Sequence, residues 1–566
     1  MVKGFVMKTT FKYDHYYKYD ELKSNLKHFA VTYPDLVDLD VNCVTEEGRN
    51  QYVVTITNKK TGGALSKPGW YLDGNIHAGE VTASMAAMYT VDYMLTNYGE
   101  DPEITKLIDE MTVYVIPRVT PDGAETYLTT PKTLRSVNRE YMSKDGGVRD
   151  EDLDGDGVVR MMRIKTPYGA WKIDPKRPDS MMLRDPGDSE GTFYDIYPEG
   201  VLIPFDGSEN LKMEKDPWGL DFNRNFPLGW FPDSRQPGAG KYPLSNIETK
   251  AIVDFVLAHP NIGGAAIGHT SGGLFLYPPG TRPSKSAPYN DIKTMVAIAN
   301  MGKEELGYVP LNIFDSFMSD QTQYDSGALD DWFYQSQGIP AYTVEFWDLD
   351  TKVGVPYNWF DRSKETPELQ MKRFNACIDW VKENAPEYYE DWTAFEHPVF
   401  GEVEIGGFNY KFTHQNPPGK FLTEECEKDA KFNLRFMKAM PKLNIDSLAA
   451  EELGDGLYKV TAIVGNLGYL PTNLTDEAVN QHVDKPVKVS FKGGEILSGK
   501  ETEEIGNLSG YSRTVTGAFF YGNLTTEENA PARKKVVWLV KAKKGTEVTV
   551  TASQEKAGIV SASVVL

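Results

Sequence analysis

The chain has 566 residues, of which 40% are hydrophobic and 25% charged, and its formal net charge is −21. A chain of this length exceeds what one hydrophobic core supports, so two or three folded domains are expected rather than a disordered chain. The acidic residues are spread along the sequence, which argues against the clustered Lys and Arg that a nucleic-acid-binding surface needs.

Cysteine usage and hydropathy narrow the class further. The three cysteines, Cys43, Cys377 and Cys426, are too few and too scattered for a disulfide framework or a thiolate metal site. No run of about 18 apolar residues predicts a membrane span, and residues 1–10 contain no apolar run of signal-peptide length. At face value the protein is cytoplasmic, but a secreted protein whose signal has been removed would have the same features.

Helix-like and strand-like segments alternate over residues 11–395, which we expect to form one catalytic domain. Leu22, Leu26 and Phe29 fall on one face of an early helix, and Val81–Leu95 predicts a second helix. Short apolar runs predict buried strands at Trp70–Leu72, Val113–Ile116, Ala265–Ile267 and Tyr342–Val344. Such alternation favours a mainly parallel or mixed sheet covered by helices.

Residues 143–217 interrupt this pattern and are polar and rich in Gly, Pro and Asp. A structureless loop of that length is uncommon inside a compact domain, so we interpret the segment as an insertion at the rim of a cleft. Its acidic run Asp150–Gly157, with Asp150, Asp152, Asp154 and Asp156 at alternate positions, resembles the first half of a calcium loop. No Glu stands at the twelfth position, which excludes an EF-hand. Calcium bound in another way and a solvated acidic loop remain as alternatives.

The pattern changes again after residue 395. Residues 396–440 are expected to be a linker with one helix, Thr423–Met440, and residues 441–566 a separate domain. Period-2 segments predict strands at Tyr458–Val464, Val487–Phe491, Val536–Val540, Val548–Ala552 and Ile559–Val564. Short strands separated by turn residues are typical of an immunoglobulin-like β-sandwich. The sequence leaves open what this domain binds.

His77 and Glu80 lie where the strand Trp70–Leu72 gives way to a loop and a helix. An imidazole and a carboxylate three residues apart can hold one divalent metal, although such pairs are common by chance. Hydrolysis needs three protein ligands and an open position, where a bound water becomes a nucleophile near neutral pH. Of the eight histidines, His269 is the candidate third ligand because it follows the apolar strand Ala265–Gly268.

The segment that contains His77 and Glu80 is the first of five that follow one another in a fixed order along the chain. They are Asn75–Glu80, Thr120–Gly123, Asp221–Phe226, Gly268–Thr270 and Thr343–Asp348. In these segments the chain resembles the zinc metallocarboxypeptidases of the carboxypeptidase A/B type, over about residues 11–390. The resemblance implies an α/β domain with a mixed central sheet of about eight strands flanked by helices. It also implies one Zn²⁺ per chain, held by His77, Glu80 and His269.

The resemblance also assigns roles residue by residue. Glu345 is similar to the general base that takes a proton from the metal-bound water and passes it to the leaving amine. Asn223 and Arg224 resemble the pair that binds the terminal carboxylate of the substrate, since a guanidinium fork donates two charge-assisted hydrogen bonds. Asp221 resembles the acid that holds the other ring nitrogen of His77.

Three further positions are less firmly aligned. Tyr324 matches the mobile tyrosine that closes over the substrate, in a loop one residue shorter than the family pattern. Arg135 is our choice for the arginine that polarises the scissile carbonyl, with Arg139 as the alternative. Asp330 matches the base of the pocket for the terminal side chain, where an acid would favour Lys or Arg. The alternative for Asp330 is a loop carboxylate turned to solvent.

The sequence therefore predicts a zinc-dependent metallocarboxypeptidase that hydrolyses the C-terminal bond of peptides or proteins. A preference for basic terminal residues is one interpretation of Asp330. No long segment precedes the catalytic domain, so activity without proteolytic processing is expected. One alternative is a murein peptidase on the same scaffold, in which Asp330 would meet the amine of a diamino acid. Another is a non-catalytic binding protein, but all three ligands and the base are present.

Overall fold

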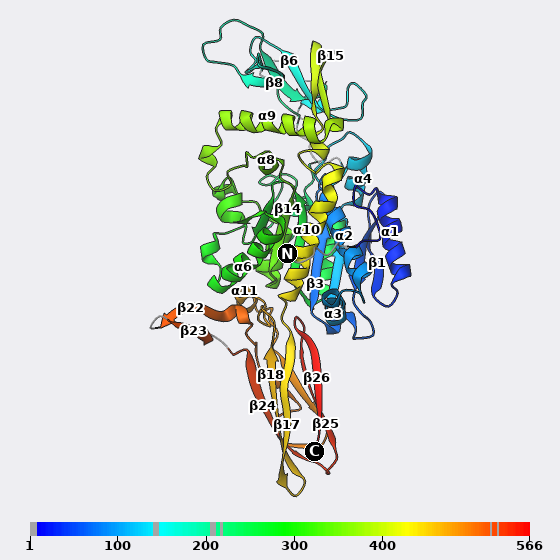
Figure 1. Ribbon diagram of the computed structural model, residues 1–566, viewed down its shortest axis with the longest axis vertical. Coiled ribbons are helices and arrows are strands. Elements are labelled where there is room, and N and C mark those ends of the chain that lie inside the picture. The colour runs from blue at the N-terminus through cyan, green and yellow to red at the C-terminus, as the bar shows by residue number, and fades with distance from the viewer. Residues whose placement is uncertain (1–7, 140–145, 204–210, 215–218, 521–522, 529–530) are drawn as a thin grey trace.

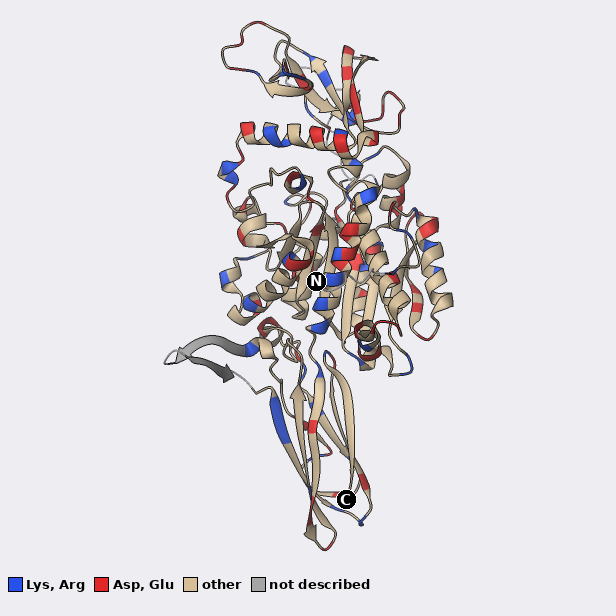
Figure 2. Cartoon of the chain, in the orientation of Figure 1, with Lys and Arg blue, Asp and Glu red and all other residues tan. Residues whose placement is uncertain are grey.

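The computed structural model describes residues 8–139, 146–203, 211–214, 219–520, 523–528 and 531–566, and only the backbone between 514 and 530 (Figure 1). Acidic residues are distributed over both domains and interspersed with Lys and Arg, as the sequence predicts (Figure 2). Across these described ranges, no helix is both long and apolar enough to cross a membrane.

An eight-stranded mixed sheet forms the centre of the larger domain, in the order β1-β2-β4-β3-β11-β14-β12-β13. These strands are β1 (Val37–Val44), β2 (Asn50–Ile56), β3 (Gly69–Gly74), β4 (Thr112–Ile116), β11 (Ile262–Thr270), β12 (Leu274–Tyr277), β13 (Val309–Asn312) and β14 (Ala341–Phe346). Strands β4, β3, β11 and β14 are mutually parallel, so their carboxyl ends meet at one edge. The predicted mixed sheet of about eight strands is confirmed.

Helices cover both faces of this sheet (Figure 1). The helices of the larger domain are α1 (Tyr19–Thr32), α2 (Val81–Asn97), α3 (Pro102–Glu110), α4 (Pro121–Thr129), α5 (Ile247–Ala258), α6 (Tyr289–Leu306), α7 (Leu329–Asp331), α8 (Leu349–Lys352), α9 (Pro367–Asn384) and α10 (Gly419–Lys438). Helix α2 is rich in Ala and Met and almost wholly buried, as expected for a helix packed on several sides.

Two glycines let α2 lie unusually close to the sheet edge. A Cβ at Gly74 of β3 would stand 2.5 Å from the carbonyl oxygen of Ala83, and one at Gly268 of β11 would stand 2.8 Å from the Ala83 Cβ. Because glycine has no Cβ, the first turn of α2 packs directly on the ends of β3 and β11. This packing fixes the loop before α2, which carries His77 and Glu80.

The predicted insertion folds into strands that join a later part of the chain. The strands are β5 (Gly147–Asp150), β6 (Met161–Lys165), β7 (Trp171–Asp174), β8 (Arg177–Leu183), β9 (Tyr194–Pro198), β10 (Gly200–Ile203), β15 (Tyr389–His397) and β16 (Gly401–Phe408). A six-stranded sheet has the order β15-β16-β6-β9-β7-β8, and β5 pairs with β10. This sheet forms one end of the molecule, above α9 in Figure 1. Residues 143–145, 204–210 and 215–217 of the insertion lie outside the described residues.

Helix α10 lies within the segment expected to be a linker. It packs against α2 and α6, and its buried Leu422, Phe432 and Phe436 join the core of the larger domain. The helix therefore packs as part of that domain, while the division of the chain at residues 395 and 440 stays a prediction.

The C-terminal domain contains two four-stranded sheets around one core and a separate two-stranded sheet. Its elements are β17 (Leu443–Gly454), β18 (Leu457–Asn466), α11 (Asp476–Asn480), β19 (Lys488–Lys492), β20 (Glu495–Ser498), β21 (Thr502–Glu504), β22 (Thr514–Phe520), β23 (Asn523–Glu528), β24 (Arg533–Lys541), β25 (Glu547–Gln554) and β26 (Gly558–Val565). The orders are β17-β18-β24-β20 and β21-β19-β25-β26. Val460, Trp538 and Val550 are fully buried between the two sheets, which confirms the predicted β-sandwich.

Candidate metal centre

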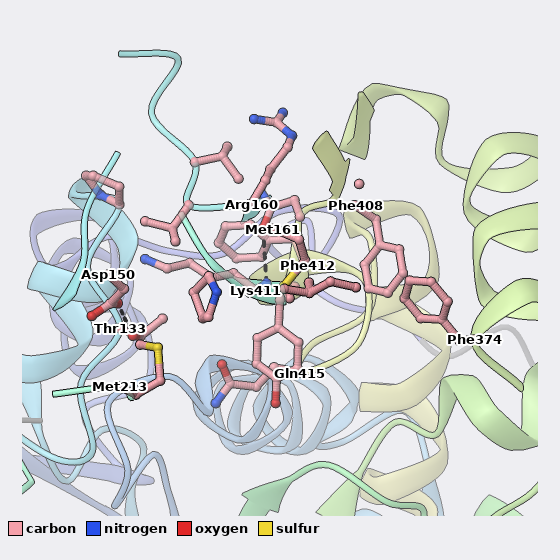
Figure 3. Close-up of a pocket in the computed structure, with 18 of the residues that line it drawn as sticks. Thr133, Asp150, Arg160, Met161, Met213, Phe374, Phe408, Lys411, Phe412 and Gln415 are labelled. Atoms are coloured by element: carbon pink, nitrogen blue, oxygen red, sulfur yellow. Dashed lines mark hydrogen bonds between the residues drawn. The ribbon is translucent and has the colours of Figure 1, made fainter. Parts of the chain in front are cut away.

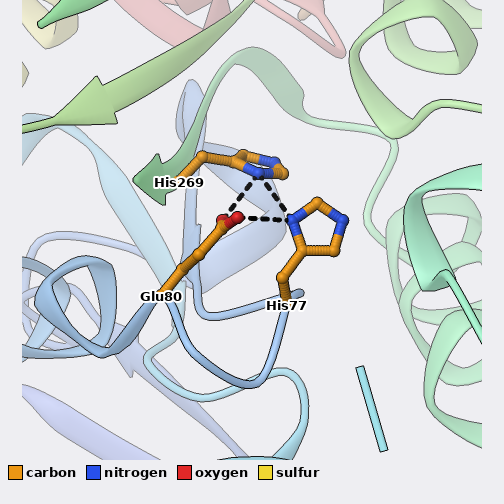
Figure 4. Close-up of side chains that lie close together, drawn as sticks. All are labelled: His77, Glu80 and His269. Carbon is orange, nitrogen blue, oxygen red and sulfur yellow. Dashed lines mark hydrogen bonds and ion pairs between the residues drawn. The ribbon is translucent and has the colours of Figure 1, made fainter. Parts of the chain in front are cut away.

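His77, Glu80 and His269 converge at the carboxyl edge of the central sheet (Figure 4). His77 and Glu80 come from the loop after β3, and His269 lies near the end of the neighbouring parallel strand β11. The Nδ1 atom of His77 lies 2.9 Å from Glu80 Oε1, and the Nδ1 atom of His269 lies 2.9 Å from Glu80 Oε2. The two Nδ1 atoms are 3.2 Å apart. One cation could contact all three side chains.

The chemistry of these groups fits a zinc ion. Two imidazoles and one carboxylate are common zinc ligands, and here they are buried with their ligand atoms within 4.8 Å of one another. Burial raises the pKa of Glu80, but His77 and His269 outweigh it and hold that pKa below its usual range. Burial alone would lower the pKa of His269, but Glu80 raises it to about 9. The ionised carboxylate thus stabilises positive charge at this point.

Asp221 supports the metal centre from the opposite side of His77. Asp221 caps the short helix η2 (Phe222–Arg224). Its Oδ1 atom lies 3.1 Å from His77 Nε2 and accepts a hydrogen bond of 2.8 Å from the backbone of Asn223 within that helix. Its Oδ2 atom accepts 2.8 Å from Arg135 Nε. Burial raises the pKa of Asp221, but Arg135 and His77 hold it well below its usual range. An ionised Asp221 would keep His77 Nδ1 free for a metal.

The two candidate arginines lie in different surroundings. Arg135 Nη1 is 3.6 Å from Glu80 Oε1, and its side chain is 40% exposed. Arg139 is instead held by Glu46 and Glu248, each at 2.9 Å. Only Arg135 of this pair therefore lies beside the candidate metal ligands.

Glu345 stands directly opposite His269 on the parallel strand β14. It is partly exposed, unlike the other residues of that strand. Burial of its carboxyl group raises its pKa to about 8, with Glu80 and Asp330 adding to the rise and His269 and Arg135 opposing it. The structure thus places the predicted base one strand away from a predicted metal ligand.

Of the predicted substrate-binding residues, Asn223 and Arg224 lie in η2, Tyr324 lies in the segment before α7, and Asp330 lies in α7. Asn223 Oδ1 accepts a hydrogen bond of 3.0 Å from the backbone of Leu329. Arg224 Nη2 lies 2.9 Å from the carboxylate of Asp325, whose side chain is 50% exposed. The guanidinium of Arg224 is therefore already paired with a group that solvent can reach.

Tyr324 and Asp330 flank this region in different ways. The ring of Tyr324 lies 5.6 Å from that of Phe231. Asp330 is only 3% exposed, and its carboxylate accepts 2.8 Å hydrogen bonds from Thr343 Oγ1 and from the backbone of Asp331. The side chain of Asp330 is thus buried at the sheet edge rather than turned to solvent.

Asn416 is a supporting residue that the sequence analysis did not single out. Its Oδ1 accepts a 3.0 Å hydrogen bond from the backbone of Thr82, and its Nδ2 donates 2.7 Å to the carbonyl of Gly79. It therefore holds both sides of Glu80 from a segment 334 residues further along the chain. No local pattern marks such a contact, because the Asn-Pro-Pro-Gly sequence that contains it reads only as a turn.

A family model described as zinc carboxypeptidase matches residues 22–361, which is more than half of the chain. The chain belongs to the zinc carboxypeptidase family. A second model, described as a domain of unknown function, matches residues 442–565. The predicted resemblance is confirmed, and the comparisons do not favour the murein-peptidase or binding-protein alternatives.

Similar proteins carry carboxypeptidase names. The chain is 24% identical to carboxypeptidase A4 of Mus musculus over 339 residues, 60% of this chain and 64% of that protein. It is 22% identical to carboxypeptidase A2 of Rattus norvegicus over 392 residues, 68% of this chain and 71% of that protein. Thus the chain spans less than two thirds of the length of the mouse relative. Carboxypeptidase A from Helicoverpa armigera is a solved structure with a TM-score of 0.39 and 16% identity, covering 64% of this chain and 72% of that one.

Proposed function

We propose that this chain is a zinc-dependent metallocarboxypeptidase that hydrolyses the C-terminal bond of peptides or proteins. The observation that carries this proposal is the convergence of His77, Glu80 and His269 with Glu345 at one sheet edge. Three nitrogen and oxygen ligands with a carboxylate on the adjacent strand are what metal-assisted hydrolysis of an amide requires.

His77, Glu80 and His269 would hold the ion. Bound zinc would supply Lewis-acid activation of a water molecule and of the scissile carbonyl. Glu345 takes a proton from the attacking water onto its carboxylate and delivers it to the leaving amine. The guanidinium of Arg135, which borders Glu80, donates a hydrogen bond to the carbonyl oxygen as negative charge develops there.

Arg224 and Asn223 would bind the terminal carboxylate of the substrate. Arg224 is paired with the half-exposed Asp325. The incoming carboxylate therefore replaces one negatively charged partner of Arg224 with another. Only a chain end offers a carboxylate at that position, which restricts the reaction to the last peptide bond. Asp330, buried nearby, would favour Lys or Arg as the released residue.

A matched peptide panel tests this proposal. Peptides that end in Lys, Arg, Phe, Leu, Glu or diaminopimelate would be incubated with the zinc-loaded protein, with and without a chelator, alongside amidated copies. We expect chelator-sensitive release of the last residue, fastest for Lys and Arg, and no release from amidated peptides. Cleavage of the diaminopimelate peptide alone would select the murein-peptidase alternative, and no cleavage of any peptide would contradict the proposal.

Calcium at the acidic loop stays a prediction. Asp152, Asp154 and Asp156 bring one carboxylate oxygen each within 4.8 Å of the others. Asp150 instead accepts a 2.7 Å hydrogen bond from Thr133 Oγ1, so it stands outside this group. Calorimetric titration with Ca²⁺ tests the prediction, because binding should disappear in Asp154→Asn.

A further inference from the structure

A cavity of about 1270 Å³ lies between the metal centre and the six-stranded sheet (Figure 3). His77 and Arg135 line it at the metal centre, and Met181 of β8 and Trp392 of β15 line it at the sheet. Pockets that hold a single small ligand usually measure about 300–1,000 Å³. The cavity is therefore large enough for an extended ligand that reaches from the metal centre to the sheet.

Much of the cavity wall comes from chain that the family model does not cover. Phe374 of α9, Phe408 at the end of β16 and Phe412 lie beyond residue 361, where the match ends. The wall also includes Met161 of β6, the strand paired with β16, from the segment that interrupts the catalytic domain. The cavity is thus built where the six-stranded sheet meets the catalytic domain.

Most of the exposed lining is apolar, and aromatic and methionine side chains contribute to it. The rings of Phe374 and Phe408 are 6.0 Å apart, and both side chains are only partly buried. Figure 3 shows these two rings side by side, with Phe412 and Met161 nearby around the same space. Binding of an apolar ligand is favourable when it covers partly exposed aromatic faces inside a cavity.

The charged side chains of the wall already have protein partners. Lys411 donates to three backbone carbonyls, one in α4 and two just after it, and burial lowers its pKa to about 7. Arg149 Nε lies 2.6 Å from Glu214, and Arg160 pairs with Asp156. Asp150 accepts its hydrogen bond from Thr133 (Figure 3). These contacts leave the apolar surface as the main means of recognition.

The cavity borders the metal centre but not the residues predicted to bind the terminal carboxylate. His77 and Arg135 border it, whereas Asn223, Arg224 and Asp330 are absent from its lining. If the terminal carboxylate lies against Asn223 and Arg224, the rest of the substrate must leave the metal centre elsewhere. Because Arg135 borders the cavity, the rest of the substrate can extend from the metal centre into it.

We propose that this cavity binds the segment of a substrate peptide that precedes the scissile bond, and that it selects apolar and aromatic side chains there. The inference rests on the proposed carboxypeptidase function. It assigns upstream specificity to the six-stranded sheet, α9 and residues 408–415, whereas the terminal residue is selected around Asp330.

Four N-terminally blocked peptides with the same last two residues test the inference. Three carry Leu-Phe-Leu, Ser-Gly-Ser or Glu-Ser-Glu before those residues, and the fourth is the blocked dipeptide alone. We expect kcat/KM for the Leu-Phe-Leu peptide to exceed that for Ser-Gly-Ser roughly ten- to hundredfold, as burial of one or two large apolar side chains predicts. Equal values for the three long peptides, with the dipeptide still cleaved, would overturn the inference and leave the proposed function intact.

Variants at two lining residues provide the structural test. Phe374→Ser and, separately, Met161→Ser should reduce the ratio of kcat/KM between the Leu-Phe-Leu and Ser-Gly-Ser peptides several-fold. The matched control is Tyr168→Ser, because Tyr168 belongs to the same insertion as Met161, is 87% exposed and does not line the cavity. An unchanged ratio in both wall variants would overturn the inference. If no peptide is cleaved, the proposed function fails, and calorimetric titration with the Leu-Phe-Leu peptide tests the cavity by itself. Saturable binding that Phe374→Ser weakens would support the role of the cavity. Absence of binding would refute it.

Discussion

Asp221 and Arg135 are joined by a 2.8 Å hydrogen bond from the arginine Nε to the carboxylate Oδ2. The other oxygen of the same carboxylate lies 3.1 Å from His77 Nε2. A single buried acid therefore orients a predicted metal ligand and the predicted carbonyl-polarising arginine at once. Loss of its charge should disturb metal binding and catalysis together.

Replacement of Asp221 by Asn tests this coupling. We expect zinc affinity to fall about 10- to 100-fold, because outer partners of metal-bound histidines typically have effects of that size. A chromophoric chelator in competition with the protein would measure the affinity. Asp254→Asn is the control, since Asp254 is exposed and pairs with Lys250 on the surface of α5. Equal zinc affinity in Asp221→Asn and wild type would contradict the coupling.

Replacement of Glu345 by Gln separates catalysis from metal binding. The carboxylate of Glu345 is not one of the three converging ligand groups, so zinc stoichiometry should remain at one per chain. We expect kcat to fall about 10²- to 10⁴-fold, the usual contribution of a positioned general base. Metal analysis beside steady-state kinetics would measure both. A variant that keeps full activity, or one that loses its zinc, would contradict this assignment.

The pair of Arg224 and Asp325 predicts competition with the substrate. Their contact at 2.9 Å must be exchanged when a terminal carboxylate binds Arg224. Since Asp325 is half exposed, the pair is worth about 1 kcal/mol at most, and Asp325→Asn should lower KM by up to about fivefold. Asp320→Asn, an exposed neighbour in the same loop, should leave KM unchanged. A raised KM in Asp325→Asn would show that Asp325 helps to position Arg224 instead.

The sequence predicts the metal edge well because each of its parts is local. Apolar runs predict β3, β11 and β14, and polar residues that follow or end such strands must meet at the carboxyl edge when the strands are parallel. The sequence alone therefore predicts that His77, His269 and Glu345 lie close together. The ligand roles came from the family resemblance, which ordered segments supported.

The sequence does not predict the six-stranded sheet, because its pairing is distant in the chain. Strand β6 pairs with β16, where Arg163 stands opposite Glu404, 241 residues later. Strands such as β6 and β7 are short and partly exposed, so their period-2 signal is weak. The sequence therefore predicts only an irregular insertion there. Asn416 was missed for the same reason, since its contacts with the loop around Glu80 are made by packing rather than by spacing.

Asp330 predicts the choice of terminal residue. Asp330→Asn keeps the shape of the side chain and removes its charge, so kcat/KM for peptides ending in Lys or Arg should fall roughly tenfold or more relative to Leu. The matched control is Asp331→Asn, whose carboxylate instead bonds the backbone of Gly280 and the amide of Gln335. An unchanged Lys-to-Leu ratio in Asp330→Asn would remove Asp330 from the pocket.

Asp429 predicts a pH dependence of stability that is independent of the metal. This residue of α10 is 2% exposed and accepts a 2.8 Å hydrogen bond from Asn433. Burial raises its pKa to about 7, although the Asn433 bond opposes the rise. The folded chain then keeps a proton that the unfolded chain releases near pH 4. The resulting stabilisation is complete below about pH 4 and is lost as the pH rises through about 7.

Asp429→Asn removes this titration while it keeps the size of the side chain. Relative to wild type, the variant should gain roughly 2–4 kcal/mol in free energy of unfolding between pH 4 and pH 8, since each pKa unit corresponds to about 1.4 kcal/mol. Denaturant unfolding of both chains at several pH values would measure the difference. Glu427→Gln, a partly exposed position on the same helix, should show no such trend. A difference that does not vary with pH would mean that Asp429 is ionised in the folded protein, and that its buried charge is balanced by Asn433 and its surroundings.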